Sequence, residues 1–299
     1  MNETSELLRQ ARAQGIVFID PRIDYAFKLI FGTPGNEDLL LRLVQAILPD
    51  KGIISVSLVP QEQVGLRPDA RKSVVDVRCH TDDGSELIIE MQIKSQNDFS
   101  DRMVFYSSFP IINRLTRGDN NSFKLTPLYM VGITDFIIPG VLANDDMINH
   151  YTIRNIKDNG IEFTDSIHYV TVELPKLTKT LAEVKDTSDW ILFTIKNIGS
   201  MKEMPKEYRG SYLERFFELS KFAAMEEMSQ REYLARYMWE VDQRSQLRSA
   251  REDGLAEGIA IGQVEGRVET ARRMLAKGFP LETISELTSL SVEEICELS

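Results

Sequence analysis

Two strand-like runs joined by a short acidic turn constrain this chain more than any other segment. The first run covers residues 73–79 and the second covers residues 86–94. Because successive side chains of a strand point to opposite faces, each run has one largely apolar face that can be buried in a core. The opposite face carries the polar side chains Asp76, Glu90, Gln92 and Lys94.

Asp76 and Glu90 would be neighbours if the two runs form a hairpin. Two adjacent carboxylates repel each other, and both stay ionised when a cation lies between them. An acidic residue on one strand facing an acid–x–polar pattern on the next strand therefore suggests a Mg²⁺ or Mn²⁺ site for phosphodiester hydrolysis. The alternative is a solvated sheet face with unrelated charges, which is common in antiparallel sheets.

The length of the turn decides whether the two carboxylates meet. A two-residue turn at Asp83-Gly84 would pair Asp76 with Met91, and Glu90 would then point to the wrong face. A three-residue loop, Asp82-Asp83-Gly84, pairs Asp76 with Glu90, and Gly84 can adopt the left-handed conformation that such loops need. We predict the three-residue loop, or a bulge with the same effect.

Composition sets wider limits. The 299 residues can form one large domain or two modest ones, and 42% hydrophobic and 27% charged residues are ordinary values for a globular protein. The two cysteines are far apart and the three histidines are scattered, so we expect no disulfide or zinc site and structural or exposed histidines. We find no apolar run of membrane length and no signal peptide, and we expect a cytoplasmic protein without a membrane partner.

The net charge of −11 argues mildly against nucleic-acid binding. The negative charge is spread along the chain, however, and a nuclease gathers carboxylates at its metal site. Local basic positions are therefore more informative than the total charge.

The order of the predicted elements indicates an α/β fold. A helix that Asp20-Pro21 would begin carries Asp24 and Lys28 on one face, which alone suggests a surface ion pair. Strand-like runs at 53–60, 73–79 and 86–94 follow, then a helix at 96–117 with Arg102 and Tyr106, and a buried strand at 126–134. The last strand–helix–strand unit predicts a parallel pairing with a right-handed crossover.

In this order the residues resemble the PD-(D/E)XK nuclease superfamily, and more narrowly the Rpn family of recombination-promoting nucleases and putative transposases. The resemblance covers about residues 19–200. It rests on Asp24-x-x-Phe27-Lys28-x-x-Phe31-Gly32, Val75-Asp76-Val77, Ile89-Glu90-Met91-Gln92, Gln96, Asp101-Arg102, Tyr106-Ser107-Ser108, Pro127-x-Tyr129, the run from Ile167 to Lys176, and Asp189-Trp190. One departure from the superfamily pattern is Gln92, which stands where the usual lysine would be.

The resemblance implies a restriction-endonuclease-like core, a mixed central sheet flanked by helices in the order α-β-β-β-α-β, followed by a helical C-terminal region. It also implies a metal-dependent DNA endonuclease with a role in DNA recombination or in defence against foreign DNA. A rival hypothesis is a catalytically weak nucleic-acid-binding or regulatory protein that keeps the nuclease fold.

Under this hypothesis Asp76 and Glu90 hold Mg²⁺, with Mn²⁺ or another divalent cation as alternatives, and Gln92 and the Ile93 carbonyl complete or orient the site. The positive charge that the usual lysine supplies would come from Lys28 or Lys94. We favour Lys28, because Asp24 lies one helical turn before it and can hold its ammonium group. Phosphate-binding or supporting positions are Asp24, Gln96, Arg102 and Tyr106.

The C-terminal part of the chain is predicted to be helical. We divide the chain into a lead-in (1–18), the nuclease-like domain (19–200), a helical region (201–252) and a tail (253–299). Glycines recur every four residues in the tail, at Gly254, Gly258, Gly262 and Gly266. They cost helix stability, so they suggest either close helix packing in a homo-oligomer or a partly unwound hinge.

The last residues, from Val268 to Leu298, are predicted to form three short helices with a core of Leu275, Ile284, Leu287, Leu290 and Ile295. The length and turns fit a helix-turn-helix. The last helix, Val-Glu-Glu-Ile-Cys-Glu-Leu, is acidic, and acidic residues disfavour contact with phosphates. We therefore prefer an interaction or packing module.

Overall fold

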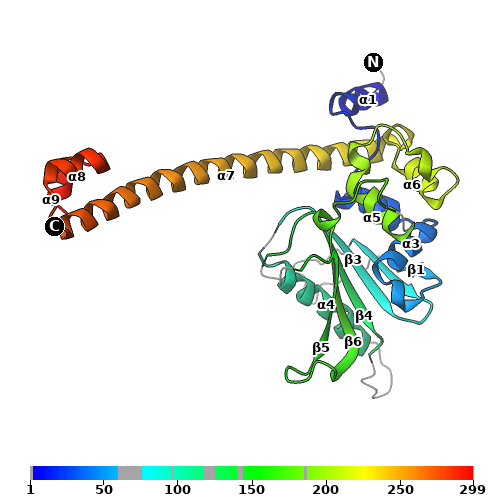
Figure 1. The fold of residues 1–299 in the computed structure, drawn as a ribbon. Helices are drawn as coiled ribbons and strands as arrows, with labels where there is room; N and C mark the ends of the chain where they lie inside the picture. The colour runs from blue at the N-terminus through cyan, green and yellow to red at the C-terminus, as the bar shows by residue number, and fades with distance from the viewer. Residues whose placement is uncertain are drawn as a thin grey trace. The chain divides into compact units, whose positions relative to one another are not determined.

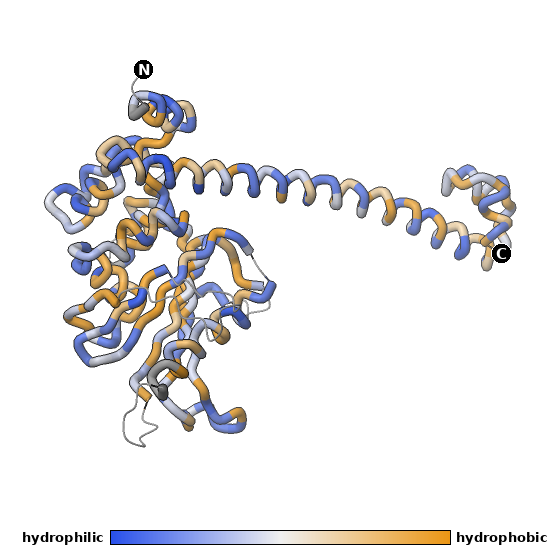
Figure 2. Tube along the Cα trace, turned by 180° about the vertical axis from the view of Figure 1, so that it is seen from behind, coloured by the Kyte–Doolittle hydropathy of each residue, from blue (hydrophilic) through white to orange (hydrophobic). Residues whose placement is uncertain are grey.

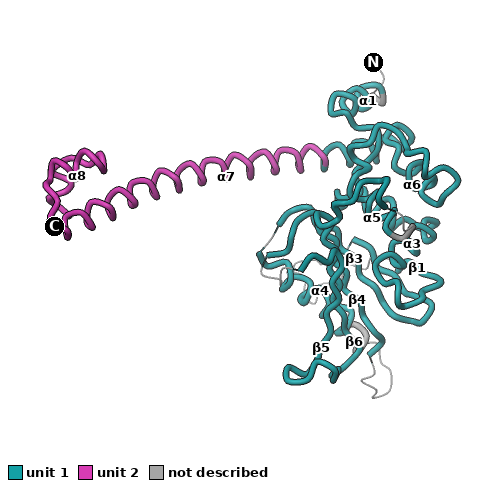
Figure 3. The backbone as a smooth tube through the Cα atoms, in the orientation of Figure 1, with its two compact units in different colours: residues 1–236 teal, residues 237–299 magenta. Residues whose placement is uncertain are grey.

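The computed structural model describes residues 3–59, 76–95, 97–116, 125–139, 144–184 and 187–298. The chain forms two compact units, residues 1–236 and 237–299 (Figure 3). The α-helices are α1 (Glu3–Ala13), α2 (Asp24–Phe31), α3 (Glu37–Ile47), α4 (Phe99–Thr116), α5 (Thr187–Asn197), α6 (Tyr212–Ser220), α7 (Glu227–Ala276), α8 (Leu281–Thr288) and α9 (Val292–Cys296). The strands are β1 (Val56–Leu58), β2 (Val77–Thr81), β3 (Glu86–Gln92), β4 (Leu128–Thr134), β5 (Ile148–Arg154) and β6 (Glu162–Glu173).

A six-stranded mixed sheet forms the centre of the first unit, in the order β1-β2-β3-β4-β6-β5 (Figure 1). Strands β3, β4 and β6 run parallel, while β1 and β2 on one side and β5 on the other pair antiparallel. Helix α4 connects β3 to β4, as the predicted parallel unit requires. The mixed sheet, its flanking helices and the helical C-terminal region confirm the predicted α/β architecture.

The hairpin between β2 and β3 has the predicted register. Val77 pairs with Ile89, so Asp76, one residue before β2, lies opposite Glu90. The Thr81 N–H donates to the Ser85 carbonyl at 3.0 Å and closes a three-residue loop, in which Gly84 has a φ of +80°. The loop prediction is confirmed, although β2 begins only at Val77, and residues 73–75 lie outside the described residues.

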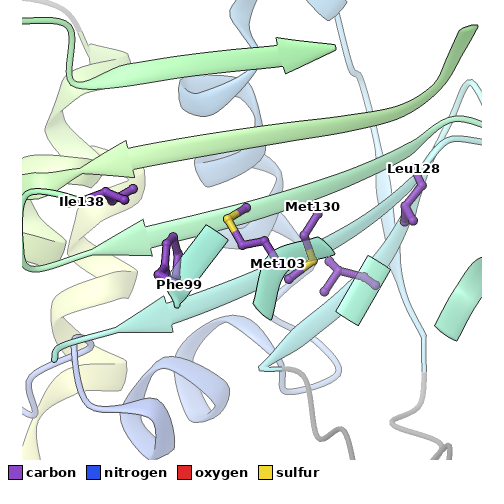
Figure 4. Packing of buried hydrophobic residues seen from close by; sticks show 6 residues of the cluster. Phe99, Met103, Leu128, Met130 and Ile138 are labelled. Carbon is purple, nitrogen blue, oxygen red and sulfur yellow. The ribbon is translucent and has the colours of Figure 1, made fainter. Parts of the chain in front are cut away.

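Helix α4 covers the polar face of this hairpin. Ile88, Leu128 and Met130 of the sheet pack against Phe99 and Met103 of α4 (Figure 4). Gly132 permits this close approach, because an added Cβ would lie 2.5 Å from Cζ of Phe99. The alternative of a solvated sheet face is therefore wrong, since Glu90 is buried beside an apolar cluster.

The opposite face of the sheet carries the larger apolar core. Ile89, Met91, Val131 and Val172 are buried on it. Helix α2 begins at Asp24, later than the predicted start at Asp20. Asp20 accepts hydrogen bonds from the backbone and side chain of Arg22 instead of capping a helix.

The second unit contains most of α7 together with α8 and α9. The four regularly spaced glycines lie inside α7, so this segment is helical rather than unwound. Apolar side chains such as Leu247, Leu255 and Ile259 are exposed along it, and Figure 2 shows hydrophobic and hydrophilic residues mixed along the helix.

The end of the chain has a small core of its own. Ala271, Ile284 and Ile295 are fully buried, and Leu275 and Leu290 pack against them, as predicted. Leu287 was expected in this core but is 67% exposed. The first of the three predicted short helices is the last part of α7. No helix in the described ranges is both long and apolar enough to cross a lipid bilayer.

Candidate active site

Two buried carboxylates face each other at one end of the sheet. Asp76 is 4% exposed and Glu90 is 5% exposed. The Met91 N–H donates to Oδ2 of Asp76 at 2.7 Å, which fixes this carboxylate against β3. Nε2 of Gln92 approaches Oε2 of Glu90 at 3.4 Å, but Oε1 of Glu90 is buried and has no hydrogen-bond partner among the described residues. A buried polar atom without a partner is costly and therefore marks a place where a ligand can bind.

Lys28 reaches this pair from α2. Its Nζ lies 2.9 Å from Oδ1 of Asp76 and 3.7 Å from Oδ2 of Asp24. Asp24 and Lys28 are four residues apart on one helix, and this spacing places their side chains on the same face. The structure thus brings Lys28, Asp24 and Asp76 together, in the arrangement on which the preference for Lys28 over Lys94 depended.

The pKa values reflect this crowding of charge. Burial, and then the charge of Asp76, raises the pKa of Glu90 to about 8. Burial also raises the pKa of Asp76, while Lys28 and the Met91 N–H act in the opposite direction. For Lys28, burial opposes the charged form, but the surrounding carboxylates raise its pKa above the ordinary value. Lys28 therefore offsets the charge of Asp76, whereas at Glu90 the charges of Lys28 and Arg102 lower the pKa by less than burial and Asp76 raise it.

The donor atoms at this position fit a divalent cation. The two adjacent carboxylates, including the buried Oε1 of Glu90, offer oxygen ligands, which Mg²⁺ and Mn²⁺ prefer. Within the described part of the chain, no three or more His, Cys, Asp or Glu residues cluster as metal ligands. A cation here would accordingly have a shell completed by water, by substrate oxygens and by neighbouring carbonyl or amide groups, as is usual for Mg²⁺.

A small hollow opens beside Glu90, between the sheet and α4. Its lining residues are Glu90, Gln92, Phe99, Arg102, Met103, Tyr106 and Met130. Nη2 of Arg102 donates to the Tyr106 hydroxyl at 3.3 Å, and the guanidinium carbon lies 5.5 Å from the centre of the Tyr106 ring. Arg102 and Tyr106, predicted as phosphate-binding or supporting residues, therefore lie in the same hollow as Glu90 and Gln92.

The remaining predicted positions are less closely defined. Ile93 and Lys94 follow the end of β3, so strand alternation no longer determines which face their side chains occupy. The Asp135 N–H donates to the Gln92 carbonyl at 2.9 Å, one residue before the predicted Ile93 carbonyl ligand. Gln96 lies outside the described residues.

Arg236 of α7 is near this site and was not predicted. Its Nη1 lies 4.0 Å from Oδ2 of Asp24, the oxygen that Lys28 also approaches. Arg236 and Asp24 are far apart in the sequence, and the long charged helix gave no local signal for this contact. Only the packing of the first turns of α7, up to Arg236, within the first unit brings them together.

The histidines of β5 and β6 form a second cluster of ionisable groups. His150 and His168 are hydrogen-bonded through Nε2 and Nδ1 at 3.0 Å, and Nε2 of His168 contacts the Asp165 carbonyl at 2.7 Å. The Tyr129 ring stacks on the His168 ring at 4.3 Å. The two side chains are therefore not scattered in space, but their contacts agree with the structural role expected for them.

A family model described as PD-(D/E)XK nuclease family transposase matches residues 21–250. The chain belongs to this family. The match includes Asp76 and the elements α2, β3 and α4, which carry the other predicted groups of the candidate site that the structure describes. A second family model, the C-terminal HTH domain of the Rpn/YhgA-like nuclease family, matches residues 265–299. Comparison with curated proteins and with solved structures gives no match.

Membership of this nuclease family and the helix-turn-helix domain support a nuclease with a DNA-binding role. The second match corrects the preference for a packing module at the end of the chain. That preference was based on the acidic charge of the last helix. The three-helix arrangement depends instead on the buried Ala271, Ile284 and Ile295. Surface charge affects which ligand a helix can bind and does not determine this packing.

Proposed function

We propose that the protein is a divalent-metal-dependent endonuclease that hydrolyses phosphodiester bonds in DNA. The observation that carries this proposal is the buried Oε1 of Glu90, which has no hydrogen-bond partner in the described part of the chain and lies beside a second buried carboxylate. Two such carboxylates next to an ammonium group are suited to bind a cation and a phosphate together. Family membership supplies the reaction class.

Asp76 and Glu90 would hold the cation, with Gln92 and the Ile93 carbonyl completing or orienting its shell. When bound, the cation would acidify a water molecule for attack on phosphorus and offset the charge that develops on the phosphoryl oxygens. The Met91 N–H keeps Asp76 in place for this task. Gln92 is neutral, and near Glu90 it can orient a carboxylate oxygen or a water molecule.

Lys28 would supply the positive charge that the superfamily usually takes from the position of Gln92. Its ammonium group is already at 2.9 Å from Asp76, so it can stabilise negative charge on the phosphate without a large rearrangement. Arg102, in the hollow beside Glu90, would hold a non-bridging phosphate oxygen, and Tyr106 would keep its guanidinium oriented.

A cleavage assay on supercoiled plasmid tests the proposal. We expect nicking or linearisation with Mg²⁺ or Mn²⁺, no cleavage with EDTA, and none by the Glu90→Gln variant in either metal. Calorimetric titration with Mn²⁺ gives a second readout, because the variant should lose binding of the metal itself. A protein that binds DNA but cuts it under none of these conditions would support the rival binding or regulatory function.

The C-terminal unit would bring DNA to the nuclease unit through its helix-turn-helix domain. A role in recombination or in defence against foreign DNA agrees with the transposase description of the family. Self-association through the four glycines of α7 stays a prediction. Truncation before Gly254 should lower the number of chains per particle, measured by light scattering. One chain per particle in both the full-length and the truncated protein would contradict self-association.

A further inference from the structure

The first turns of α7 are firmly attached to the nuclease unit. The Tyr233 side chain is 1% exposed, and its hydroxyl accepts a hydrogen bond from the Asp20 N–H at 2.9 Å. Nε2 of Gln230 donates to the Phe222 carbonyl at 3.0 Å, and Leu234 is buried. Arg236 therefore extends from a fixed stretch of helix, and its position relative to α2 is set by packing.

Arg236 ends a row of alternating charges that begins at the candidate metal site. Asp76 contacts Lys28, Lys28 contacts Asp24, and Asp24 contacts Arg236. The exposed fraction of the side chain increases at each step, from 5% for Asp76 to 27% for Lys28, 42% for Asp24 and 52% for Arg236. The row thus leads from the buried carboxylates to the surface.

The Arg236 guanidinium contributes little to holding α7 in place. An ion pair between half-exposed side chains at 4.0 Å has a small effect on stability. Tyr233, Gln230 and Leu234 already fix this part of the helix through buried contacts. Glu232, one turn earlier, accepts a hydrogen bond from Nε of Arg236 at 3.0 Å and orients the guanidinium. A charged, oriented and half-exposed arginine of this kind suits recognition of phosphate.

We propose that Arg236 binds a backbone phosphate of the DNA strand next to the phosphate that is cleaved. This inference rests on the proposed nuclease function. A strand whose scissile phosphate lies at Asp76 and Glu90 would pass Lys28 and then meet Arg236 at the surface. The incoming phosphate would replace Asp24 as a partner of the guanidinium, and Asp24 would remain paired with Lys28. The first turns of α7 are then part of the DNA-binding surface.

Duplex DNA binding over a series of salt concentrations tests this assignment. The full-length chain carries Glu90→Gln, so that the DNA is not cut, and is compared with the same chain carrying Arg236→Met. Loss of one phosphate contact should lower the slope of log affinity against log salt by about 1. Arg236→Lys should retain most of the slope, because lysine keeps the charge.

Arg231→Met is the matched control. Arg231 lies on the same helix and pairs with Glu227 at 2.9 Å, also across four residues, and it is similarly exposed. We expect the control to keep the slope of the parent chain. An equal slope in the Arg236→Met and Arg231→Met proteins, or no binding of DNA by the parent chain, would overturn the proposal.

Kinetics separate phosphate binding from an indirect effect through Lys28. With Glu90 intact, Arg236→Met should raise the KM for duplex DNA several-fold and leave the single-turnover rate at saturating protein nearly unchanged. A lower saturated rate with an unchanged KM would show instead that Arg236 acts on Lys28, and would overturn the assignment. If the wild-type chain does not cleave at all, the proposed function fails, while the salt titration still decides whether Arg236 contacts phosphate.

Discussion

Two clusters of ionisable side chains on the sheet, Asp76 with Glu90 and His150 with His168, differ in whether their polar atoms have partners. Asp76 and Glu90 are two buried acids side by side, and Oε1 of Glu90 accepts no hydrogen bond from any described residue. At His150 and His168, the rings bond to each other, and the second nitrogen of His168 contacts a backbone carbonyl. The first cluster can gain stability from a ligand, whereas the second already has internal partners for these nitrogens.

The two clusters also have pKa shifts with opposite effects on stability. The pKa of Glu90 is raised to about 8, mainly by burial and then by Asp76. Burial lowers the pKa values of both His150 and His168. A raised carboxyl pKa makes the folded state less stable as pH increases, and a lowered histidine pKa makes it less stable as pH decreases.

The largest expected effect is on cleavage. Asp76→Asn and Glu90→Gln should each reduce plasmid cleavage by about 10³-fold or more, because the cation loses an anionic ligand. His168→Asn, at the other cluster, should cut at nearly the wild-type rate when assayed at a temperature where it is folded. Equal losses in the His168 and Glu90 variants would remove the distinction between the two clusters.

The next effect concerns the source of positive charge. We expect Lys28→Met to lower the single-turnover cleavage rate about 10²-fold, equivalent to about 3 kcal/mol of transition-state stabilisation. Lys94→Met and Gln92→Ala should have smaller effects. A wild-type rate for Lys28→Met with inactive Lys94→Met would assign the role to Lys94, and equal large losses would mean that both lysines share it.

A third effect is on stability at the acidic cluster. Between about pH 4.5 and 8, the folded protein keeps a proton on Glu90 that the unfolded chain has lost, so wild-type stability should fall through this range. Glu90→Gln removes this loss and should be more stable at pH 8 by up to a few kcal/mol. Asp76→Asn should gain less stability, because Asp76 also forms an ion pair with Lys28 and accepts a hydrogen bond from the Met91 N–H.

Thermal unfolding of the metal-free proteins, measured from pH 4 to pH 9, checks whether wild-type stability falls as pH rises. The difference in Tm between Glu90→Gln and wild type should be small at pH 4 and should grow toward pH 8. A constant difference across the range would show that the charge of Glu90 is not the cause.

The smallest effect is expected at the histidine pair. Below its ordinary pKa of 6.5, the unfolded chain binds protons that the folded pair resists, so stability falls as pH decreases through this region. His150→Asn should make the dependence of Tm on pH less steep between pH 5 and 7. The change should be modest, because His150 is only partly shielded from solvent. A steeper dependence in the variant would contradict the lowered pKa.

Much of the acidic cluster could be predicted because local rules determine it. Strand alternation and a three-residue loop are sufficient to place Asp76 opposite Glu90, and helical spacing places Asp24 near Lys28. The contact between Lys28 and Asp76 could be predicted only with the family resemblance, which indicated where the first helix lies relative to the sheet. The covering of the polar sheet face by α4 was missed, because the hairpin alone does not show which element packs on it.

Contacts between segments that are distant in the sequence were the main features that could not be predicted. Nothing near Arg236 in the sequence indicates Asp24, and nothing near His150 indicates His168, because strand pairing and helix packing decide both contacts. The C-terminal helices were predicted at the positions where they lie, although the first is the end of α7 and Leu287 is exposed instead of buried. The acidic charge of the last helix was given too much weight. Charge patterns indicate possible ligands, while the buried apolar positions determine the fold.

Gly132 shows how a position without any reactive group can limit the chemistry of its neighbours. It pairs with Glu90 across β3 and β4, and the space that a methyl group would fill is taken by the Phe99 ring. Any larger residue would have to displace the Phe99 ring or the Met103 side chain, and both line the hollow together with Arg102 and Tyr106. The width of the hollow is thus fixed by a missing side chain, so sequence change at Gly132 is restricted even though it need never touch the substrate.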